Sequence, residues 1–467
     1  MSFIRYKQRG TRWYAYQVEN IWDKESKKYV QHSIYMGVAD SKGGTYSKKE
    51  TRLIEKGIID FGDSYIISKV FEFTNLNEIL AQTTLEANNI MNLVCYQLTS
   101  GSAMYNCKDW LEGNIAQYLY PNAYYNSQKI SKLLIKLGDN DLQMKFFKKY
   151  IENFFPEKRG ILIDSTALPN AINTSISSWG YSATKIDHKV GCLMLVDQKS
   201  KLPIFFRAIA GEIADISTLQ FTINEIHHLG LNVESAIFDA GYFSEENIKY
   251  LCNSNINFVS RMPKSRIVFK ELIHSIANIE SPSNAVLYGK RIVFIQSQKI
   301  KLYEHDVFAH IILDLDKKAK DTNKILSEYL ANPTEKAQLE LQLQYSGFLI
   351  LISKNSIEKP DILPTYYTRQ SIEQIFGFAK INNLLPLRVH SEQAIKGYLF
   401  LVFISIIIFV SIRQNLDSEY TVEQVLLILR NWKGKLYDKR VVPMEANKKI
   451  KSIFKQMKFT VPISVGI

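Results

Sequence analysis

Cysteine and proline are scarce in this sequence of 467 residues, and each scarcity excludes a class of protein. The cysteines are far apart and include no C-x-x-C pair: Cys95, Cys107, Cys192 and Cys252. Neither a disulfide framework nor a zinc ribbon is therefore indicated. Only 12 prolines accompany 46% hydrophobic and 12% aromatic residues, which excludes a disordered chain. We expect a globular protein of two or three modules in a reducing compartment, the cytoplasm.

Acidic residues are also in deficit, 46 against 58 basic residues, which gives a formal net charge of +12 and a pI near 9.1. Such an excess of positive charge favours a polyanionic partner, and nucleic acid is the leading candidate. The first residues, MSFIRYKQRGTRWYAY, lack the apolar core of a signal peptide. Export is therefore not expected.

Long hydrophobic runs are limited to residues 397–412, GYLFLVFISIIIFVSI, where 16 residues carry no charge. A helix that spans a bilayer needs roughly 20 such residues. We therefore predict a buried helix and no membrane partner. A membrane protein is the alternative that this single run leaves open.

The chain changes character several times, and the changes define modules. Residues 1–50 alternate aromatic and polar positions around DKESKK, which predicts a two-stranded N-terminal β-hairpin module. Residues 51–155 have helical spacing and are predicted to form a helical DNA-binding module. Residues 416–467 are predicted to form a C-terminal helical region.

The middle of the chain has the pattern of an α/β fold. Residues 156–263 predict the order β, β, β, α, β, α, β, and residues 346–415 supply a further strand, GFLILIS, and helices. Residues 264–345 interrupt this order with β-rich pieces and a charged helical stretch. We predict one mixed sheet flanked by helices, built from two sequence segments around a β-rich insertion.

Two aspartates follow apolar runs that predict strands. Asp164 ends GILID and Asp239 ends ESAIFD. If the two strands are neighbours, both carboxylates lie at the edge of the sheet where ligands of open α/β sheets bind. Glu373 could join them from a helix packed on the sheet. Each acid alone is more often a turn, cap or surface residue, so the prediction depends on their combination.

Three clustered carboxylates repel one another unless cations share them or their pKa values are raised. Oxygen ligands suit Mg²⁺ or Mn²⁺. Two such ions can activate a water or a hydroxyl and stabilise the leaving oxygen of a phosphoryl displacement. The acids therefore indicate phosphodiester chemistry with two divalent ions, which agrees with the basic chain.

The stretch YYTRQSIEQIFGFAK, residues 366–380, combines polar and apolar faces. On one helix Tyr366, Arg369, Glu373 and Lys380 would form a single polar stripe. Arg369 offers planar bidentate geometry to a phosphate, and Lys380 offers a movable point charge. The alternative is a solvated stripe in which Arg369 pairs with Glu373 at i,i+4.

This stretch matches Y-x2-R-x3-E-x6-K at every fixed position. It resembles the signature of a large group of insertion-sequence transposases with a DDE catalytic triad. LIDST, IFDAGYF and GFLILIS resemble other motif regions of that group, in the expected order. The resemblance covers roughly residues 60–410.

The resemblance implies an RNase H-like core with a β-rich insertion between the second and third acids. It implies that Asp164, Asp239 and Glu373 are catalytic and bind the metal. It further implies that Tyr366, Arg369 and Lys380 contact DNA phosphates, and that a homodimer holds two DNA ends. The acids are 75 and then 134 positions apart, which leaves room for the insertion.

RMPKSR, residues 261–266, groups three further cations beside the proposed core: Arg261, Lys264 and Arg266. Phosphate contact and a solvated charge run are both open for them.

We therefore predict a transposase that binds the terminal inverted repeats of its element, cleaves DNA, and joins 3′-hydroxyl ends to target DNA. One alternative is a metal-dependent nuclease that cuts without joining. Another is a catalytically degenerate, transposase-derived protein that only binds DNA.

Overall fold

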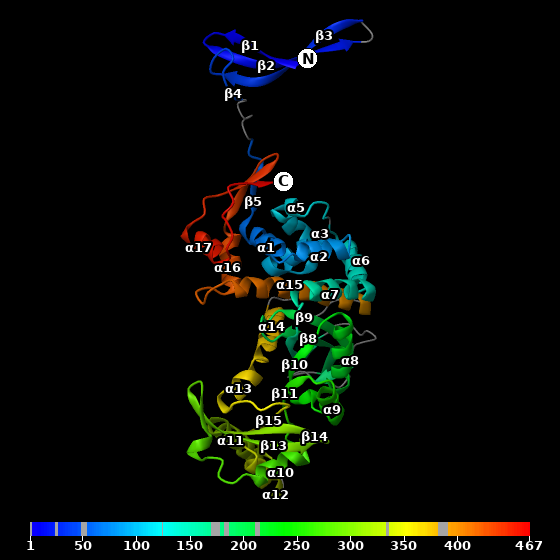
Figure 1. Ribbon diagram of the computed structural model, residues 1–467, viewed down its shortest axis with the longest axis vertical. Helices are drawn as coiled ribbons and strands as arrows, with labels where there is room; N and C mark the ends of the chain where they lie inside the picture. The colour runs from blue at the N-terminus through cyan, green and yellow to red at the C-terminus, as the bar shows by residue number, and fades with distance from the viewer. Residues whose placement is uncertain are drawn as a thin grey trace. The chain divides into compact units, whose positions relative to one another are not determined.

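The computed structural model describes residues 2–23, 27–47, 54–123, 125–169, 178–181, 186–210, 215–332, 336–381 and 391–467 (Figure 1). The chain divides into two compact units, and each is described by itself. Unit 1 comprises Met1–Ile58, Lys435–Val442 and Ser464–Ile467. Unit 2 comprises Ile59–Gly434 and Pro443–Ile463.

The N-terminal part of unit 1 is an antiparallel sheet in the order β1-β2-β3-β4. Its strands are β1 (Ser2–Arg9), β2 (Arg12–Asp23), β3 (Lys28–Ala39) and β4 (Tyr46–Ser47). Gly10, with φ of +64°, makes the tight turn between β1 and β2. The predicted hairpin is β2 and β3, but β1 and β4 extend it because both outer edges find partners.

A small sheet has the order β18-β17-β16-β5. Its strands are β5 (Gly57–Asp60), β16 (Lys433–Leu436), β17 (Arg440–Pro443) and β18 (Val465–Gly466). Two helices, α16 (Val422–Arg430) and α17 (Lys448–Gln456), alternate with these strands. The region predicted as helical at 416–467 therefore contains helices and also strands. The sequence did not predict these strands, because short strands that find partners only in the fold carry weak periodic signals.

Residues 62–154 of unit 2 form helices α1 to α7. They are α1 (Gly62–Phe73), α2 (Leu76–Thr83), α3 (Ala87–Ser100), η1 (Met104–Asn106), α4 (Cys107–Glu112), α5 (Ala116–Leu119), α6 (Ser127–Leu137) and α7 (Asn140–Phe154). Helix α3 is buried on nearly all sides, whereas in α6 apolar residues at helical spacing direct one face inward. In α6 the buried positions are Ile130, Leu133, Leu134 and Leu137.

The central sheet of unit 2 has the order β12-β13-β14-β15-β11-β10-β6-β8-β7 among the described residues, and β9 also pairs with β8. Its first strands are β6 (Arg159–Pro169), β7 (Ser178–Tyr181), β8 (Ile186–Asp197), β9 (Pro203–Ala210), β10 (Val233–Phe238) and β11 (Asn257–Arg261). β6 and β8 are antiparallel, as are β8 and β9, whereas β10 is parallel to both β6 and β11. The connecting helices are α8 (Asp215–His228), η2 (Ala240–Tyr242) and α9 (Glu245–Asn253).

Residues 264–345 continue this sheet. They contain α10 (Ile267–Ser275), η3 (Pro282–Asn284), β12 (Ala285–Tyr288), β13 (Arg291–Leu302), β14 (His305–Asp314), α11 (Leu315–Ala331) and α12 (Lys336–Gln344). β14 pairs along its length with β15 (Phe348–Ser353), and β15 pairs with β11. The β-rich insertion therefore extends the central sheet. The sequence did not indicate this, because it does not show which edge a strand joins.

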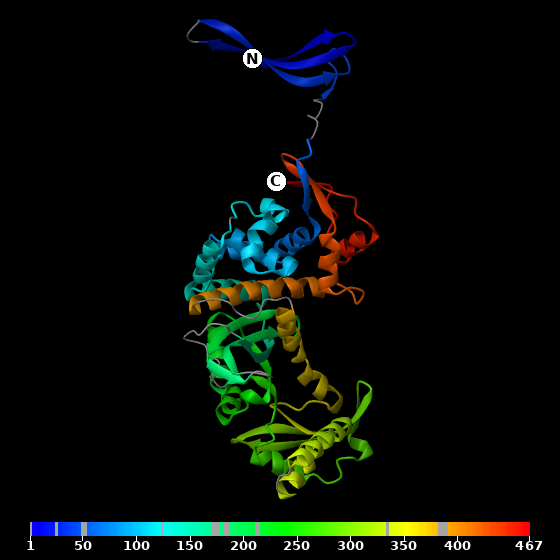
Figure 2. The same ribbon diagram turned by 180° about the vertical axis from the view of Figure 1, so that it is seen from behind.

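Helix α15 (Glu392–Gln414) contains the long apolar run. Figures 1 and 2 show it between helices α1 to α3 and the central sheet, with α7 beside it and also against β9. By length and composition it could cross a membrane, but 83% of its apolar window is buried inside the protein. Its Phe400 and Phe403 pack against Phe146 and Phe147 of α7. The prediction of a buried helix is confirmed.

Candidate active site

Asp164 and Asp239 come from neighbouring parallel strands. The pairing of β6 with β10 ends at Ile163 and Phe238, and the two aspartates are the residues that follow these two in the chain. Asp239 ends its strand, as predicted from the sequence. Asp164 does not, since β6 continues to Pro169 while it pairs with β8. The two acids are side by side because each follows a residue of the same parallel pair, Ile163 and Phe238.

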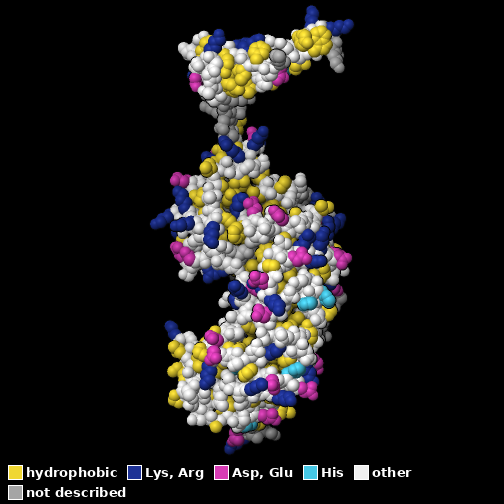
Figure 3. Space-filling view, in the orientation of Figure 1, with side chains coloured by type: hydrophobic (Ala, Val, Ile, Leu, Met, Phe, Trp, Pro, Cys, Tyr) yellow, Lys and Arg dark blue, Asp and Glu magenta, His cyan; other side chains and the backbone are white. Residues whose placement is uncertain are grey.

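Arg369 joins the three predicted acids. Its guanidinium lies 2.7 Å from Oδ2 of Asp164, 3.0 Å from Oε1 of Glu373 and 4.0 Å from Oδ2 of Asp239. Asp164 and Arg369 are largely buried, with side chains 16% and 14% exposed, whereas Glu373 is exposed. Figure 3 shows acidic and basic side chains next to one another in a hollowed part of unit 2. The i,i+4 pair of the solvated-stripe alternative exists, but it belongs to this buried cluster.

Two more side chains hold Asp239. Tyr366 donates a hydrogen bond from its hydroxyl to Oδ1 of Asp239 at 3.0 Å, and Nε of Arg261 lies 3.1 Å from the same oxygen. Arg261 was predicted only as a member of a basic group, because the sequence does not show that β11 lies beside β10. The other two cations of that group bind backbone oxygens: Lys264 that of Tyr345, and Arg266 that of Phe243.

The predicted single helix over residues 366–380 is wrong. Tyr366 lies in the last turn of α13 (Lys359–Tyr367), whereas Glu373 lies on α14 (Gln370–Ile381). Between them the amides of Arg369, Ser371 and Ile372 bond three residues back, which tightens the turn. Thr368 also bonds its hydroxyl to the carbonyl of Thr365, a local bond that competes with regular helix.

Helix α14 still orients the third acid. Its Ile372, Ile375 and Phe376 are buried, and the helix packs against β6. This packing places Glu373 beside Arg369. Lys380 belongs to α14, but the structure does not describe its side chain, so its predicted role stays a prediction.

The two aspartates have different proton affinities. Burial raises the pKa of Asp164 to about 6, although Arg369 and the Ser165 amide act against this. Burial alone would also raise the pKa of Asp239. The Ala240 amide, Arg261, Arg369 and Tyr366 outweigh it and hold that pKa below its usual value. Asp239 is therefore ionised at neutral pH, whereas Asp164 gains or loses its proton near pH 6.

The acids offer ligands that suit a divalent cation. Carboxylate oxygens are preferred by Mg²⁺ and Mn²⁺, and this cluster already surrounds one positive group. Among the described residues, however, no three His, Cys, Asp or Glu side chains are arranged around a shared ion position. The acids fit such an ion in chemistry and in charge, and the Arg369 guanidinium lies among their oxygens in this structure.

A match to a family model shows which protein family the chain belongs to. The model for the transposase DDE domain matches residues 155–408, more than half of the chain. The chain belongs to this transposase family. The matched residues include the strands and the helix that carry the three acids. The predicted transposase is confirmed at this level, whereas the narrower group with the Y-x2-R-x3-E-x6-K signature stays a prediction.

Solved transposase structures show distant similarity to this family member. A piggyBac transposase synaptic complex with hairpin DNA is 13% identical, with 78% of this chain and 76% of that chain covered and a TM-score of 0.43. A Drosophila P element transposase strand transfer complex is 12% identical, with 67% and 86% covered and a TM-score of 0.15. Both similarities are too low to transfer a residue or an activity. No curated protein matches the chain significantly.

Proposed function

We propose that this chain is a DNA transposase that binds the ends of its element, cleaves DNA phosphodiester bonds and joins 3′-hydroxyl ends to target DNA. One observation carries the proposal. Asp164, Asp239 and Glu373, from β6, the end of β10 and α14, all lie within 4.0 Å of one guanidinium. Family membership over residues 155–408 supports the same conclusion.

The core is proposed to be RNase H-like. Strand β8 pairs antiparallel with β6 and with β9, and these three strands are followed by two strands parallel to β6, each after a helix. This order supports the proposal, as does the position of two acids on adjacent parallel strands.

Asp164, Asp239 and Glu373 are proposed to hold two Mg²⁺ ions, for which Mn²⁺ would substitute. When bound, divalent ions supply Lewis-acid activation of a water or a 3′-hydroxyl. The chain's own residues prepare this site. Tyr366 and Arg261 keep Asp239 ionised and oriented, and buried Asp164 releases its proton near neutral pH.

Arg369 is proposed to change partners when DNA binds. While its guanidinium contacts the acids, its buried Nε has no hydrogen-bond partner among the described residues. A guanidinium released from the carboxylates has the planar geometry to bind a phosphate through two hydrogen bonds. Contacts of Tyr366 and Lys380 with DNA phosphates, and a homodimer that holds two ends, stay predictions.

A strand-transfer assay tests the proposed function. The full chain is incubated with Mg²⁺, target plasmid and pre-cleaved duplexes that carry the ends of its own element. Joined product is expected from the wild type. Each of Asp164→Asn, Asp239→Asn and Glu373→Gln should lose joining but still bind the duplex. Cleavage without joined product would identify a nuclease, and binding without either reaction a degenerate protein.

A further inference from the structure

One face of the N-terminal sheet of unit 1 collects four cations. Side chains alternate between the two faces of a strand, so the pairing of β1 with β2 assigns each residue to a face. Arg5 lies opposite Tyr16, Lys7 opposite Tyr14, and Arg9 opposite Arg12. We call the face with Arg5, Lys7, Arg9 and Arg12 the cationic face. No position on this face of the described strands β1 to β3 is Asp or Glu, and Glu19 lies on the opposite face.

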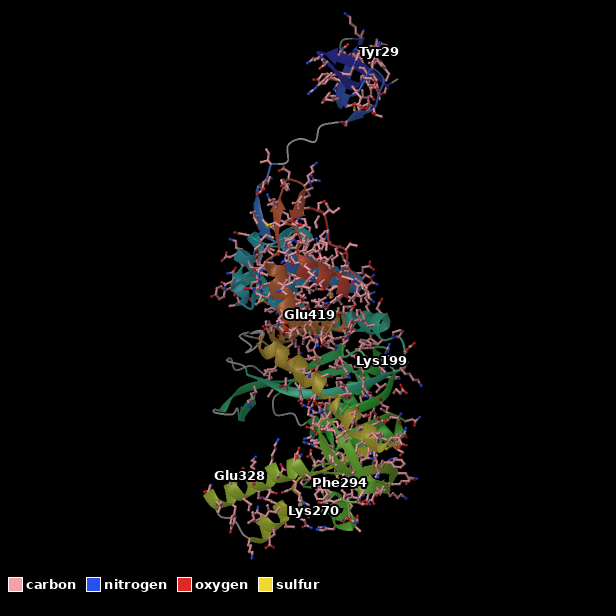
Figure 4. All side chains as sticks on the ribbon, turned by 90° about the vertical axis from the view of Figure 1, so that its left-hand side faces the viewer. Tyr29, Lys199, Lys270, Phe294, Glu328 and Glu419 are labelled. Atoms are coloured by element: carbon pink, nitrogen blue, oxygen red, sulfur yellow. The ribbon has the colours of Figure 1, made fainter. Side chains whose placement is uncertain are left out.

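The same face carries aromatic rings. Tyr35 of β3 lies 5.4 Å from the ring of Tyr16 and 6.3 Å from that of Tyr14. Farther along the hairpin, Trp22 and Tyr29 pack at 5.0 Å although they are 49% and 71% exposed. Figure 4 labels Tyr29 on this sheet, and Figure 3 shows basic and hydrophobic side chains side by side on it. A row of exposed rings marks an interaction surface.

Arg5 and Lys7 keep their charge available, because the groups that they contact among the described residues are neutral. Arg5 donates to Oε1 of Gln31 at 2.8 Å and lies over the ring of Phe3, and Lys7 lies over the ring of Tyr16. From Arg5 to Arg9 the strand rises about 14 Å. That length of duplex DNA carries about eight phosphate charges. The major groove of B-DNA also admits a two-stranded β-ribbon.

We propose that the cationic face of β1 to β3 binds double-stranded DNA, with its four cations on phosphates and its rings against the duplex. The choice of DNA as partner rests on the proposed function, whereas the face itself is independent of the three acids. A second copy of the chain is a poorer occupant. Two such faces would bring eight cations together without one carboxylate, and like charges across an interface repel.

The salt dependence of DNA binding tests this proposal. The full chain, inactivated by Asp164→Asn, is titrated with a blunt, mixed-sequence duplex between about 50 and 200 mM salt. Each phosphate contact contributes about 0.9 to the slope of log K against log salt. Combined replacement of Arg5, Lys7, Arg9 and Arg12 by Gln should therefore reduce the slope by about 3.6.

A charge-matched control removes four cations that already pair with carboxylates on unit 2. They are Lys108, Lys249, Lys299 and Lys324, each replaced by Gln. This control should keep nearly the whole slope. An equal slope in the two fourfold variants, with both folded by circular dichroism, would overturn the proposal. Tighter binding of single-stranded DNA or RNA than of the duplex would also overturn it.

Tryptophan fluorescence gives a second readout. Trp22 lies on the cationic face, whereas Trp13 pairs with Ala39 on the opposite face. Trp22→Phe should remove most of the fluorescence change on adding duplex, and Trp13→Phe should retain it. The reverse result would place DNA on the other face.

The two proposals can fail separately. If the wild type joins DNA ends and the fourfold variant of the cationic face keeps the salt slope of the parent chain, only this proposal fails. If the slope falls but no joining occurs, only the proposed catalytic function fails.

Discussion

Arg369 lies 2.7 Å from Asp164, although the two residues are 205 positions apart in the chain. The same guanidinium contacts Glu373 and approaches Asp239. One positive side chain thus offsets part of the negative charge of the acids that we propose as metal ligands. Metal binding, proton binding and the position of Arg369 are coupled, because all three compete for the same carboxylate oxygens.

Arg369→Gln should strengthen binding of Mn²⁺ to the chain without DNA. Removing a positive charge within 4.0 Å of three carboxylates favours another cation by about 1 kcal/mol in water and by more in a buried site. We expect at least a fivefold lower dissociation constant, about 1 kcal/mol, measured by electron paramagnetic resonance of free Mn²⁺.

Arg291→Gln is the control for this measurement, since Arg291 pairs with Asp314 outside the site. It should leave Mn²⁺ binding unchanged. Weaker binding by Arg369→Gln would mean that Arg369 organises the acids for the metal and does not compete with it.

Asp164→Asn should stabilise the metal-free chain above pH 6. The pKa of Asp164 is about 6 in the folded chain, against 3.8 ordinarily, so the folded state binds more protons between these values. Stability of the wild type is therefore lost as pH rises through this window. Asparagine avoids burying the charge, which corresponds to roughly 1–3 kcal/mol at pH 7.5.

Urea unfolding in EDTA at pH 3.5 and pH 7.5 measures this effect, with pH values chosen on either side of about 4 and 6. The advantage of the asparagine variant should be small at the lower pH and larger at the higher one. An equal difference at both values would show that the ionisation of Asp164 is not its source.

Tyr366→Phe should destabilise the chain through the loss of one hydrogen bond, without leaving a cavity. The variant keeps the ring, which is 3% exposed, and removes the hydrogen bond to Asp239. Loss of a bond to a charged group costs about 1.5–3 kcal/mol, and the pKa of Asp239 should rise. Urea unfolding measures the loss of stability, and the strand-transfer assay measures the effect on joining. Tyr367→Phe is the matched control, because it keeps the ring that stacks on Tyr288. Equal losses in both variants would argue against a role for the Asp239 bond.

Gly397→Ala should destabilise unit 2. A Cβ at Gly397 of α15 would lie 1.9 Å from the carbonyl oxygen of Leu134, so α6 and α15 would have to separate. Overpacking of this kind costs about 1–3 kcal/mol or more. At Gly113 a Cβ meets nothing within 4 Å, so Gly113→Ala should be close to neutral. Equal midpoints of thermal unfolding for the two variants would contradict the close approach.

Local sequence patterns predicted the acids better than their surroundings. Asp164 and Asp239 were predicted from apolar runs that end in a carboxylate, and the structure places both on adjacent strands. The break between α13 and α14 was missed, because the residues from Tyr366 to Lys380 fit a helical period while hydroxyl bonds at Thr368 interrupt it. The role of Arg261 was missed because it depends on which strand lies next to β10.

By itself, the sequence determined what local chemistry determines: an α/β chain with few cysteines, a basic balance, three acids after or within apolar segments, and a buried apolar helix. Only the tertiary structure decided that the insertion continues the central sheet, that Arg369 lies among the acids, and that four cations share one face of the N-terminal sheet. The physical reason is that periodicity records which side of an element is apolar. Strand partners and the sharing of charge depend on contacts between residues far apart in the chain.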